Sequence, residues 1–260
     1  TLSDHNTSGL TESNYFTSTA NNLKCDSTYY LRAYATNAMG TTYGEEIEIT
    51  TTRLFDYDGN SYKWVQIGEQ IWMAENLKTT HYSDGVQINN GTYLTGFIEE
   101  DKCWSLPNND ISNKDIFGLY YTWFATLRGR DGSNTVPSGI QGVCPTGWHV
   151  PSLEEFSIFD STLGGGGYSG SLLKSTDENL WLPPNNFATD SYGFSAIGSG
   201  YRLSLETKYF KEFFIIGSTT LDYTETSKWE NYILSNEEPY AMRTSYPFLS
   251  AMYNIRCLKD

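Results

Sequence analysis

The chain has 260 residues, enough for one large domain or two smaller ones, and its 31 acidic and 17 basic side chains give a net charge of −14. This charge argues against nucleic acids and anionic membrane surfaces as partners, because both are bound by clusters of basic residues. Solubility explains the acidic excess, and scattered carboxylates that bind a cation are the alternative. Aromatic residues make up 15%, which is typical both of extracellular binding surfaces and of proteins rich in β-strands.

The sequence shows neither a membrane span nor an export signal. It contains no run of about 18 apolar residues, and no basic segment followed by an apolar one at its start. Because the chain begins within strand-like sequence, we expect that upstream residues are missing from it.

Residues 1–52 predict short antiparallel strands. Segments 28–36 and 45–51 alternate between two faces, and residues 37–40 form a turn between them. This hairpin resembles the last two strands of a fibronectin type III-like domain. The resemblance rests on Leu23, the segment 28–37, Gly40, Tyr43 and Gly44, with Cys25 where the family commonly has proline. It implies that the missing strands lie upstream or that residues 1–52 pack on the following domain.

A second unit begins at residue 53. Asp58-Gly59 predicts a turn between strands at 54–57 and 62–67, and a turn at 67–70 leads to a strand at 71–74. The D-x-D-x-N spacing of residues 56–60 would suit calcium, but Ser61 and Ile67 stand where an EF-hand needs glycine and glutamate. We therefore interpret this segment as a turn.

Two helices and several short strands are predicted further on. Apolar residues at 119, 123 and 127 favour a first helix over 117–127. Ser152 and Glu155 have the spacing of a capping box, which predicts a second helix from Ser152 to about Leu163, followed by glycines that suit its C-terminus. Strands are expected at 194–197, 200–205, 213–218, 240–243 and 254–258. The pattern indicates an α+β domain with few helices and long loops.

The known catalytic patterns do not occur here in a suitable context. The G-x-G-x-x-G of residues 165–170 follows a predicted helix, whereas a dinucleotide site needs it after a strand. His5, His81 and His149 lack the spacing of a zinc site, and we interpret His149 as structural. We expect no catalytic residue, no metal and no cofactor.

The four cysteines contain no C-x-x-C pair. Cys144 opens the segment C-P-T-G-W-H-V-P, and Cys257 lies in the last predicted strand. A disulfide between them would close a long loop of the unfolded chain and stabilise the folded state by roughly 4–5 kcal/mol in the chain-entropy model. Two buried thiols are the alternative, and the state of Cys25 and Cys103 is left open.

Several motifs follow one another in an order that resembles a known family. They are D-G-N-x-Y at 58–62, I-G-x-Q-x-W-M-A-E-N-L-K at 67–78, Y-x-D-G at 82–85, G-L-Y-Y-T-W at 118–123, C-P-T-G-W-H-V-P at 144–151, G-F-S-A at 193–196 with G-Y-R at 200–202, and I-R-C at 255–257. Together they resemble the Fibrobacter succinogenes major paralogous domain over about residues 54–260. We therefore predict that domain for 53–260 and a partial β-sandwich for 1–52.

The resemblance implies a C-type-lectin-like fold, with two helices, small antiparallel sheets and long loops. It also implies a cell-surface location, through an outer-membrane lipid anchor, or a secreted protein, because the family is known mainly from Bacteroidetes-type surface and secreted proteins. The chain departs from sugar-binding lectins, since residues 237–240 read E-E-P-Y where those lectins have E-P-N or Q-P-D. Residues 216–219 read I-G-S-T, where the family usually has tryptophan before two hydroxyl residues.

These features predict a non-catalytic binding protein that acts in adhesion, or in glycan or protein recognition, through the loops of residues 201–250. The candidate ligand-binding residues are Tyr201, Arg202, Tyr223, Trp229, Tyr232, Tyr240 and Tyr246. One alternative is an enzyme on the same fold, either a glycan hydrolase or an oxidase that needs Cys103, Cys144 or Cys257 exposed and unpaired. Another is a structural module of a surface assembly. The expected partner is a glycan or a surface protein.

Overall fold

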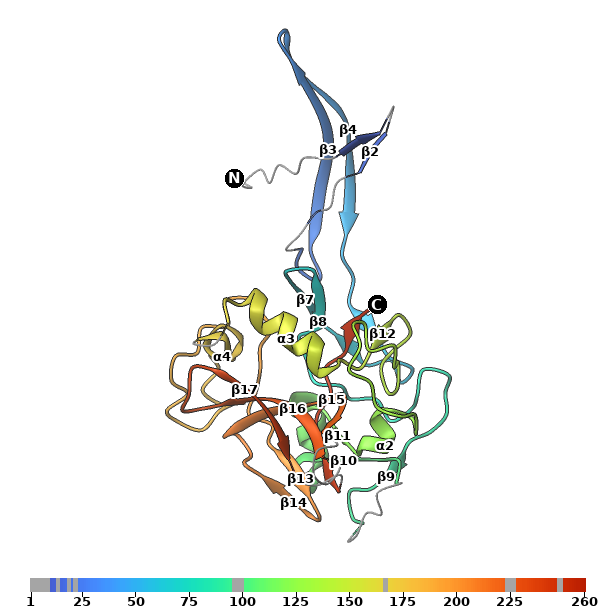
Figure 1. Ribbon diagram of the computed structural model, residues 1–260, viewed down its shortest axis with the longest axis vertical. Coiled ribbons are helices and arrows are strands. Elements are labelled where there is room, and N and C mark those ends of the chain that lie inside the picture. The colour runs from blue at the N-terminus through green and yellow to red at the C-terminus, as the bar shows by residue number, and fades with distance from the viewer. Residues whose placement is uncertain are drawn as a thin grey trace.

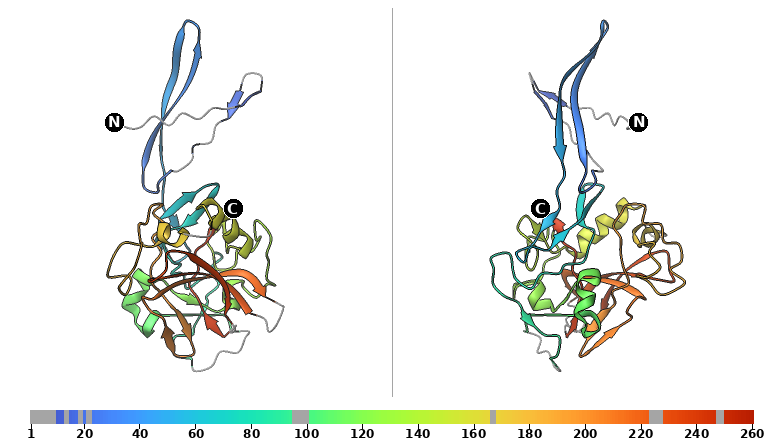
Figure 2. Two further views of the ribbon diagram at one scale, coloured as in Figure 1. Left: turned by 60° about the vertical axis from the view of Figure 1, so that its left-hand side comes forward. Right: turned by 180° about the vertical axis from the view of Figure 1, so that it is seen from behind.

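A long hairpin projects from a body of small sheets and short helices (Figure 1). The computed structural model describes residues 10–12, 15–17, 20, 23–94, 101–165, 168–222, 228–246 and 250–260. The views of Figure 2 agree that the hairpin leaves the body at its base, close to the C-terminus. Within the described residues, no helix is long and apolar enough to cross a membrane.

The hairpin consists of β3 (Thr28–Asn37) and β4 (Gly40–Thr50), as the alternating pattern predicted. Gly40 follows the turn with φ +137°, a conformation that glycine adopts without steric cost. Near the N-terminus, β1 (Leu10–Glu12) pairs with β2 (Tyr15–Thr17). The register places Leu31 opposite Ile47 on one face of the hairpin and Arg32 opposite Glu46 on the other.

Both faces of the hairpin are open along most of its length. Leu31 is 40% exposed and Ile47 is 61% exposed, although they form the apolar face. The hairpin contacts the body at its base. There the Trp64 indole donates to the Thr52 carbonyl at 2.8 Å, and the backbones of Lys24 and Val65 form an isolated antiparallel β-bridge. The hairpin face is therefore not packed on the following domain. The fibronectin type III-like assignment remains a prediction.

A four-stranded sheet joins the start and the end of the body. Its strand order is β12 (Trp148–His149), β19 (Leu258–Lys259), β8 (Gln70–Met73) and β7 (Trp64–Ile67), and all neighbours are antiparallel. The predicted turn at 67–70 is confirmed, with Gly68 at φ +62°. Beside this sheet, β5 (Leu54–Phe55) pairs with β6 (Ser61–Tyr62).

The segment between β5 and β6 is a turn, as expected. The Asp56 carboxylate accepts hydrogen bonds from Asn60 and from the Tyr62 hydroxyl, at 2.6–2.9 Å. The Asp58 carboxylate accepts from Thr80 and contacts a ring nitrogen of His81 at 2.5 Å. Burial raises the pKa of Asp58, but these hydrogen bonds outweigh it and the pKa is lowered overall. Both carboxylates are therefore occupied by protein donors.

A second antiparallel sheet lies at the centre of the body, formed by β15 (Phe213–Asp222), β16 (Lys228–Ser235) and β17 (Ala241–Tyr246). Because successive side chains of a strand point to opposite faces, β16 sends Trp229 and Ile233 into one hydrophobic cluster and Tyr232 and Leu234 into another. The sheet is thus buried on both sides. Strand β16 lies in a region, residues 201–250, where mainly loops are expected from the sequence, and it was not predicted.

Two smaller three-stranded sheets complete the described β-structure. One contains β14 (Glu206–Lys208), β13 (Tyr201–Leu203) and β18 (Ala251–Met252). The other contains β11 (Tyr120–Tyr121), β10 (Cys103–Ser105) and β9 (Asn89–Asn90), and its β9–β10 pair is parallel. Of the strands expected at 194–197 and 254–258, the first forms only an isolated bridge at Ala196, and the second is a regular strand only from Leu258.

Helix α3 (Leu153–Thr162) confirms the second predicted helix and its capping box. The Ser152 hydroxyl accepts from the Glu155 amide, and the Glu155 carboxylate accepts from the Ser152 amide. The helix lays Phe156 and Phe159 against Trp72, with ring centroids 5.4 and 4.8 Å away. It covers one face of the central sheet (Figure 1).

The first predicted helix, over 117–127, is wrong as a single element. The described residues there form α1 (Lys114–Phe117), β11 and α2 (Trp123–Thr126), preceded by the 3-10 turns η1 (Pro107–Asn109) and η2 (Ile111–Asn113). Gly118 adopts φ +75° and ends α1, and Tyr121 exchanges backbone hydrogen bonds with Tyr253. Long-range pairing therefore overrides the local helical spacing. A fourth helix, α4, covers Ser169–Leu173.

Cys144 and Cys257 form a disulfide, as predicted. It links the segment before β12 to the segment before β19, across 113 residues of sequence. Cys25 is half-buried and Cys103 is buried, and both are free thiols.

Arg256, next to this disulfide, is fully buried between the two hydrophobic clusters. Its guanidinium donates to the Asn76 side chain at 2.8 Å, to the Ser195 carbonyl at 2.9 Å and to the Phe194 carbonyl. It also lies over the rings of Phe194 and Phe214, 4.5 and 4.9 Å from their centroids. Burial lowers the pKa of Arg256 to about 9, and the charges of Asp190 and Glu75 oppose this shift.

Replacing this buried arginine should destabilise the body. We expect Arg256→Ala to lower the free energy of unfolding by about 3–5 kcal/mol, because three buried oxygen acceptors lose their donor. Arg243→Ala is the matched control. Because Arg243 is exposed, this substitution should lower the free energy of unfolding by less than about 1 kcal/mol. Urea unfolding followed by tryptophan fluorescence measures both. Equal losses in the two variants would contradict the assigned role of Arg256.

The hairpin should open more readily than the central sheet. A two-stranded hairpin without a covering layer is marginally stable in water, so we expect the β3 and β4 amides to exchange roughly 100-fold faster than those of β16. Hydrogen exchange of the full chain, followed by mass spectrometry, gives this ratio. Equal protection would mean that the apolar hairpin face is covered in solution.

Candidate functional site

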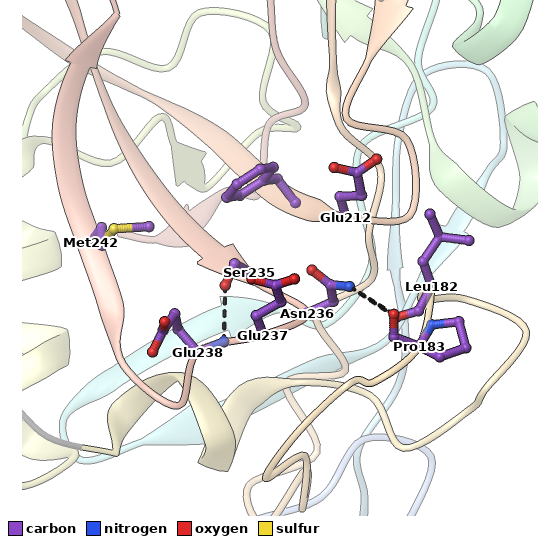
Figure 3. Close-up of a pocket in the computed structure, with 9 residues that line it drawn as sticks. Leu182, Pro183, Glu212, Ser235, Asn236, Glu237, Glu238 and Met242 are labelled. Carbon is purple, nitrogen blue, oxygen red and sulfur yellow. Dashed lines mark hydrogen bonds between the residues drawn. The ribbon is translucent and has the colours of Figure 1, made fainter.

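A pocket of about 380 Å³ lies at one end of the central sheet, between the start of β15, the β16–β17 loop and residues 182–183 (Figure 3). We call it the Glu237 pocket. Its lining residues are Leu182, Pro183, Glu212, Phe213, Ser235, Asn236, Glu237, Glu238 and Met242. The lining combines an apolar wall with three carboxylates.

Asn236 holds the pocket together. Its side-chain amide nitrogen donates to the carbonyls of Leu182 and Pro183 at 3.1 and 3.3 Å, and its backbone amide donates to the Glu212 carbonyl at 2.9 Å. The Ser235 hydroxyl accepts from the Glu238 amide at 3.0 Å and tightens the same loop. These bonds connect the three segments that line the pocket.

Lys174 supports the pocket from within the body. It follows α4, is fully buried, and donates all three ammonium protons to the carbonyls of Asn186, Ser235 and Glu238 at 2.7–3.0 Å. Burial lowers the pKa of Lys174 to about 8, and the charge of Glu238 opposes this shift. Lys174 is thus a positioning residue for the loop that carries Glu237 and Glu238.

The side-chain oxygen atoms of the pocket remain available to accept hydrogen bonds from a ligand. Asn236 is only 8% exposed, and its side-chain oxygen accepts no hydrogen bond from any residue in the described ranges. Within the same ranges, no donor or cation contacts the carboxylates of Glu212, Glu237 or Glu238. Figure 3 shows the oxygen ends of Asn236 and Glu237 turned toward the same space, whereas the Glu238 carboxylate points away from them.

Most of the predicted aromatic face is buried, so that prediction is corrected for four residues. Tyr201 is 7% exposed, and Arg202, Trp229 and Tyr232 are fully buried. Trp229 and Tyr232 lie on opposite faces of β16, because their sequence separation is odd, and they cannot form one surface.

Three of these four residues, Arg202, Trp229 and Tyr232, donate hydrogen bonds to partners inside the protein. The Trp229 indole donates to the Ser218 carbonyl at 2.8 Å, and the Tyr232 hydroxyl donates to Asp160 at 2.6 Å. The Arg202 guanidinium donates to the Asn109 side chain at 2.5 Å and to the Thr92 carbonyl at 2.6 Å. These contacts are structural.

Of the three remaining candidate tyrosines, Tyr240 is the one whose side chain the structure describes. Tyr240 is exposed and follows the pocket loop in sequence, so its role in binding remains a prediction. Tyr223 and the side chain of Tyr246 lie outside the described residues.

Sequence reasoning did not find Glu212, Asn236 or Leu182, which are distant along the chain or unremarkable in type. The one available signal is E-E-P-Y at 237–240. Two adjacent carboxylates in a predicted loop could have indicated an acidic site.

The other cluster of titratable side chains, around His149, has a structural role. The His149 ring contacts Glu155 at 2.9 Å and Asp260 at 2.7 Å. Burial lowers the pKa of His149, but these two carboxylates outweigh it and raise the pKa overall. No group of three or more His, Cys, Asp or Glu side chains among the described residues is arranged to hold a metal ion.

The cysteines do not meet the requirement set for an oxidase. Cys144 and Cys257 are paired with each other. Cys103 is 2% exposed, and burial raises the pKa of its thiol to about 11. A thiol in this setting is protonated at neutral pH and is a poor nucleophile.

The described structure defines a mixed α and β protein with short helices and several small, mainly antiparallel sheets. A family model described as the Fibrobacter succinogenes major domain matches residues 65–259. The chain therefore belongs to this family, as its ordered motifs predicted. Searches of curated proteins and of solved structures found no match.

The contribution of Lys174 to the free energy of unfolding should depend on pH. Between pH 8 and its ordinary pKa of 10.5, the unfolded chain binds more protons at this residue than the folded one does. The free energy of unfolding should therefore rise with pH in this window, by about 2 kcal/mol between pH 8 and 9.5.

Lys174→Met should remove this rise, and Lys208→Met, at a lysine whose side chain is 40% exposed, should keep it. Urea unfolding at pH 7.5, 8.5 and 9.5 compares the three proteins. Parallel curves for the wild type and Lys174→Met would contradict the lowered pKa.

Proposed function

We propose that this protein is a non-catalytic binding protein of the cell surface or the extracellular space, which recognises a protein or a glycan through the Glu237 pocket. The observation that carries the proposal is the lining of this pocket. Its carboxylates and the oxygen of Asn236 have no partner among the described residues, and an apolar wall stands beside them. Free acceptors next to apolar surface are typical of ligand sites.

A C-type-lectin-like fold for residues 53–260 belongs to the same proposal. The antiparallel pairing of β8 with β19, which joins the two ends of the body, is consistent with it. The two cores on either side of the central sheet leave the loops at its end free to carry a site. The E-E-P-Y segment lies in such a loop and lines the Glu237 pocket.

The disulfide supports a location outside the cytoplasm. Disulfides persist in oxidising compartments and are rare where thiols are kept reduced. The Cys144–Cys257 disulfide is wholly buried and joins two parts of the core, so it has a structural role.

Binding of the full chain to glycan and peptide arrays tests the proposal. We expect bound ligands whose signal falls at least about tenfold in Glu237→Arg, because the charge of the pocket is reversed at an exposed side chain. Glu69→Arg, in the exposed turn between β7 and β8, is the matched control and should bind as the wild type does.

Mass spectrometry of bound glycans after incubation separates binding from catalysis, and we expect their masses to be unchanged. Cleaved glycans would contradict the non-catalytic role. Binding that survives Glu237→Arg would place recognition outside this pocket.

A further inference from the structure

We propose that the Glu237 pocket receives a long cationic side chain, lysine or arginine, from a partner protein. This inference rests on the proposed binding function and specifies its ligand. Three observations carry it: the hydrogen-bonding character of the lining, its apolar wall and its charge.

The polar lining consists almost entirely of acceptors. The carboxylates of Glu212 and Glu237 accept only, and the Asn236 amide nitrogen already donates to the carbonyls of residues 182 and 183. The oxygen of Asn236 therefore points away from those two carbonyls and has no donor among the described residues, although the residue is only 8% exposed. An acceptor-rich site of this kind suits a ligand that only donates.

Lysine and arginine side chains are such ligands, since they donate hydrogen bonds and accept none. A sugar ring presents hydroxyl groups that both donate and accept, so a sugar site needs donors as well. Among the described polar side chains that line the pocket, the Ser235 hydroxyl is the one donor group that donates to no other residue. The lining thus favours a cationic side chain over a sugar.

The wall of the pocket suits the aliphatic part of such a side chain. Leu182 and Pro183 line one side of the pocket and Met242 lines the opposite side (Figure 3). Phe213 is the fourth apolar lining residue. Lysine and arginine pack their methylene groups on apolar surface and keep the charged end with polar partners. The aromatic ring of Phe213 can also face a cation.

The electrostatic setting points the same way. None of the described residues that line the pocket is basic. The Lys174 ammonium, behind the loop, is occupied by three carbonyl groups. With a net charge of −14, the chain as a whole also attracts a basic partner. A metal ion is a weaker candidate, because the described carboxylates do not converge as metal ligands do.

Titration of the isotope-labelled full chain with matched small probes, followed by NMR, tests the inference. The cationic probes are Nα-acetyl-lysine methylamide and Nα-acetyl-arginine methylamide. The neutral counterparts are the Nε-acetylated lysine probe and Nα-acetyl-citrulline methylamide. We expect millimolar dissociation constants for the cationic probes, with shifts at residues 212–213 and 235–242. The neutral probes should bind at least about tenfold more weakly.

The variant Glu212→Gln/Glu237→Gln keeps the side-chain shapes and removes the charges, so it should weaken the cationic probes at least about fivefold. The matched control is Glu69→Gln/Glu206→Gln, which removes the same net charge at exposed sites and should leave binding unchanged. Equal loss in both double variants would mean that only the overall charge acts, and would overturn the inference.

Two further outcomes separate this inference from the proposed function. If neutral probes or glucosamine bind the pocket as tightly as the lysine probe, the ligand class is wrong and a binding role for the pocket stands. If no probe shifts the pocket residues and array binding survives Glu237→Arg, both the ligand class and the proposed site are wrong.

Discussion

The buried guanidinium of Arg256 is the constraint on which the rest of the body depends. Burying a charge is costly unless oriented acceptors replace water, and here the acceptors come from Asn76 and from the backbone of residues 194–195. Alternation along the chain sends Ile255 and Cys257 to one hydrophobic cluster, while Arg256 contacts two aromatic rings of the other. Hydrogen bonds of this one side chain therefore hold together motifs that are up to 180 residues apart in the sequence. The arginine fixes how the two clusters meet, and the disulfide at the next residue ties that unit to the segment before β12.

The parts of the fold that sequence predicted are those that local chemistry determines. The capping box of α3, the hairpin of β3 and β4 and the turn at Gly68 each depend on a few neighbouring residues. The predicted helix over 117–127 failed because β11 takes its hydrogen bonds from β10 and from Tyr253, which no local pattern reveals. Strand β16 was missed for a related reason. It is buried on both faces, so it lacks the simple alternation of apolar and polar residues that marks a half-buried strand.

The site was harder to predict than the fold, because aromatic residues in a sequence do not tell which side of a sheet they face. Trp229 and Tyr232 satisfy their polar atoms inside the protein and contribute contact area to two cores, and this accounts for part of the high aromatic content. The residues that line the pocket come from three separated segments, and only E-E-P-Y among them was visible as a pattern. What makes Asn236 informative is its geometry, since the two carbonyls that engage its nitrogen leave its oxygen facing the pocket.

Arg256 and Lys174 also change how the net charge should be understood. Both are fully buried, and both direct all their described hydrogen bonds to neutral oxygen acceptors instead of carboxylates. Together with the fully buried Arg202, at least three of the 17 basic residues thus present no charge at the surface. Among the described residues, Arg256 and Lys174 form no direct ion pair with an acidic side chain. The surface that a partner meets is consequently more acidic than the composition suggests. Attraction of a basic partner to such a surface acts before contact and weakens with added salt, because it is screened over about 10 Å at 0.1 M ionic strength. Selection of the ligand at short range then depends on the fixed acceptors of the Glu237 pocket, which Lys174 holds in place from inside the body.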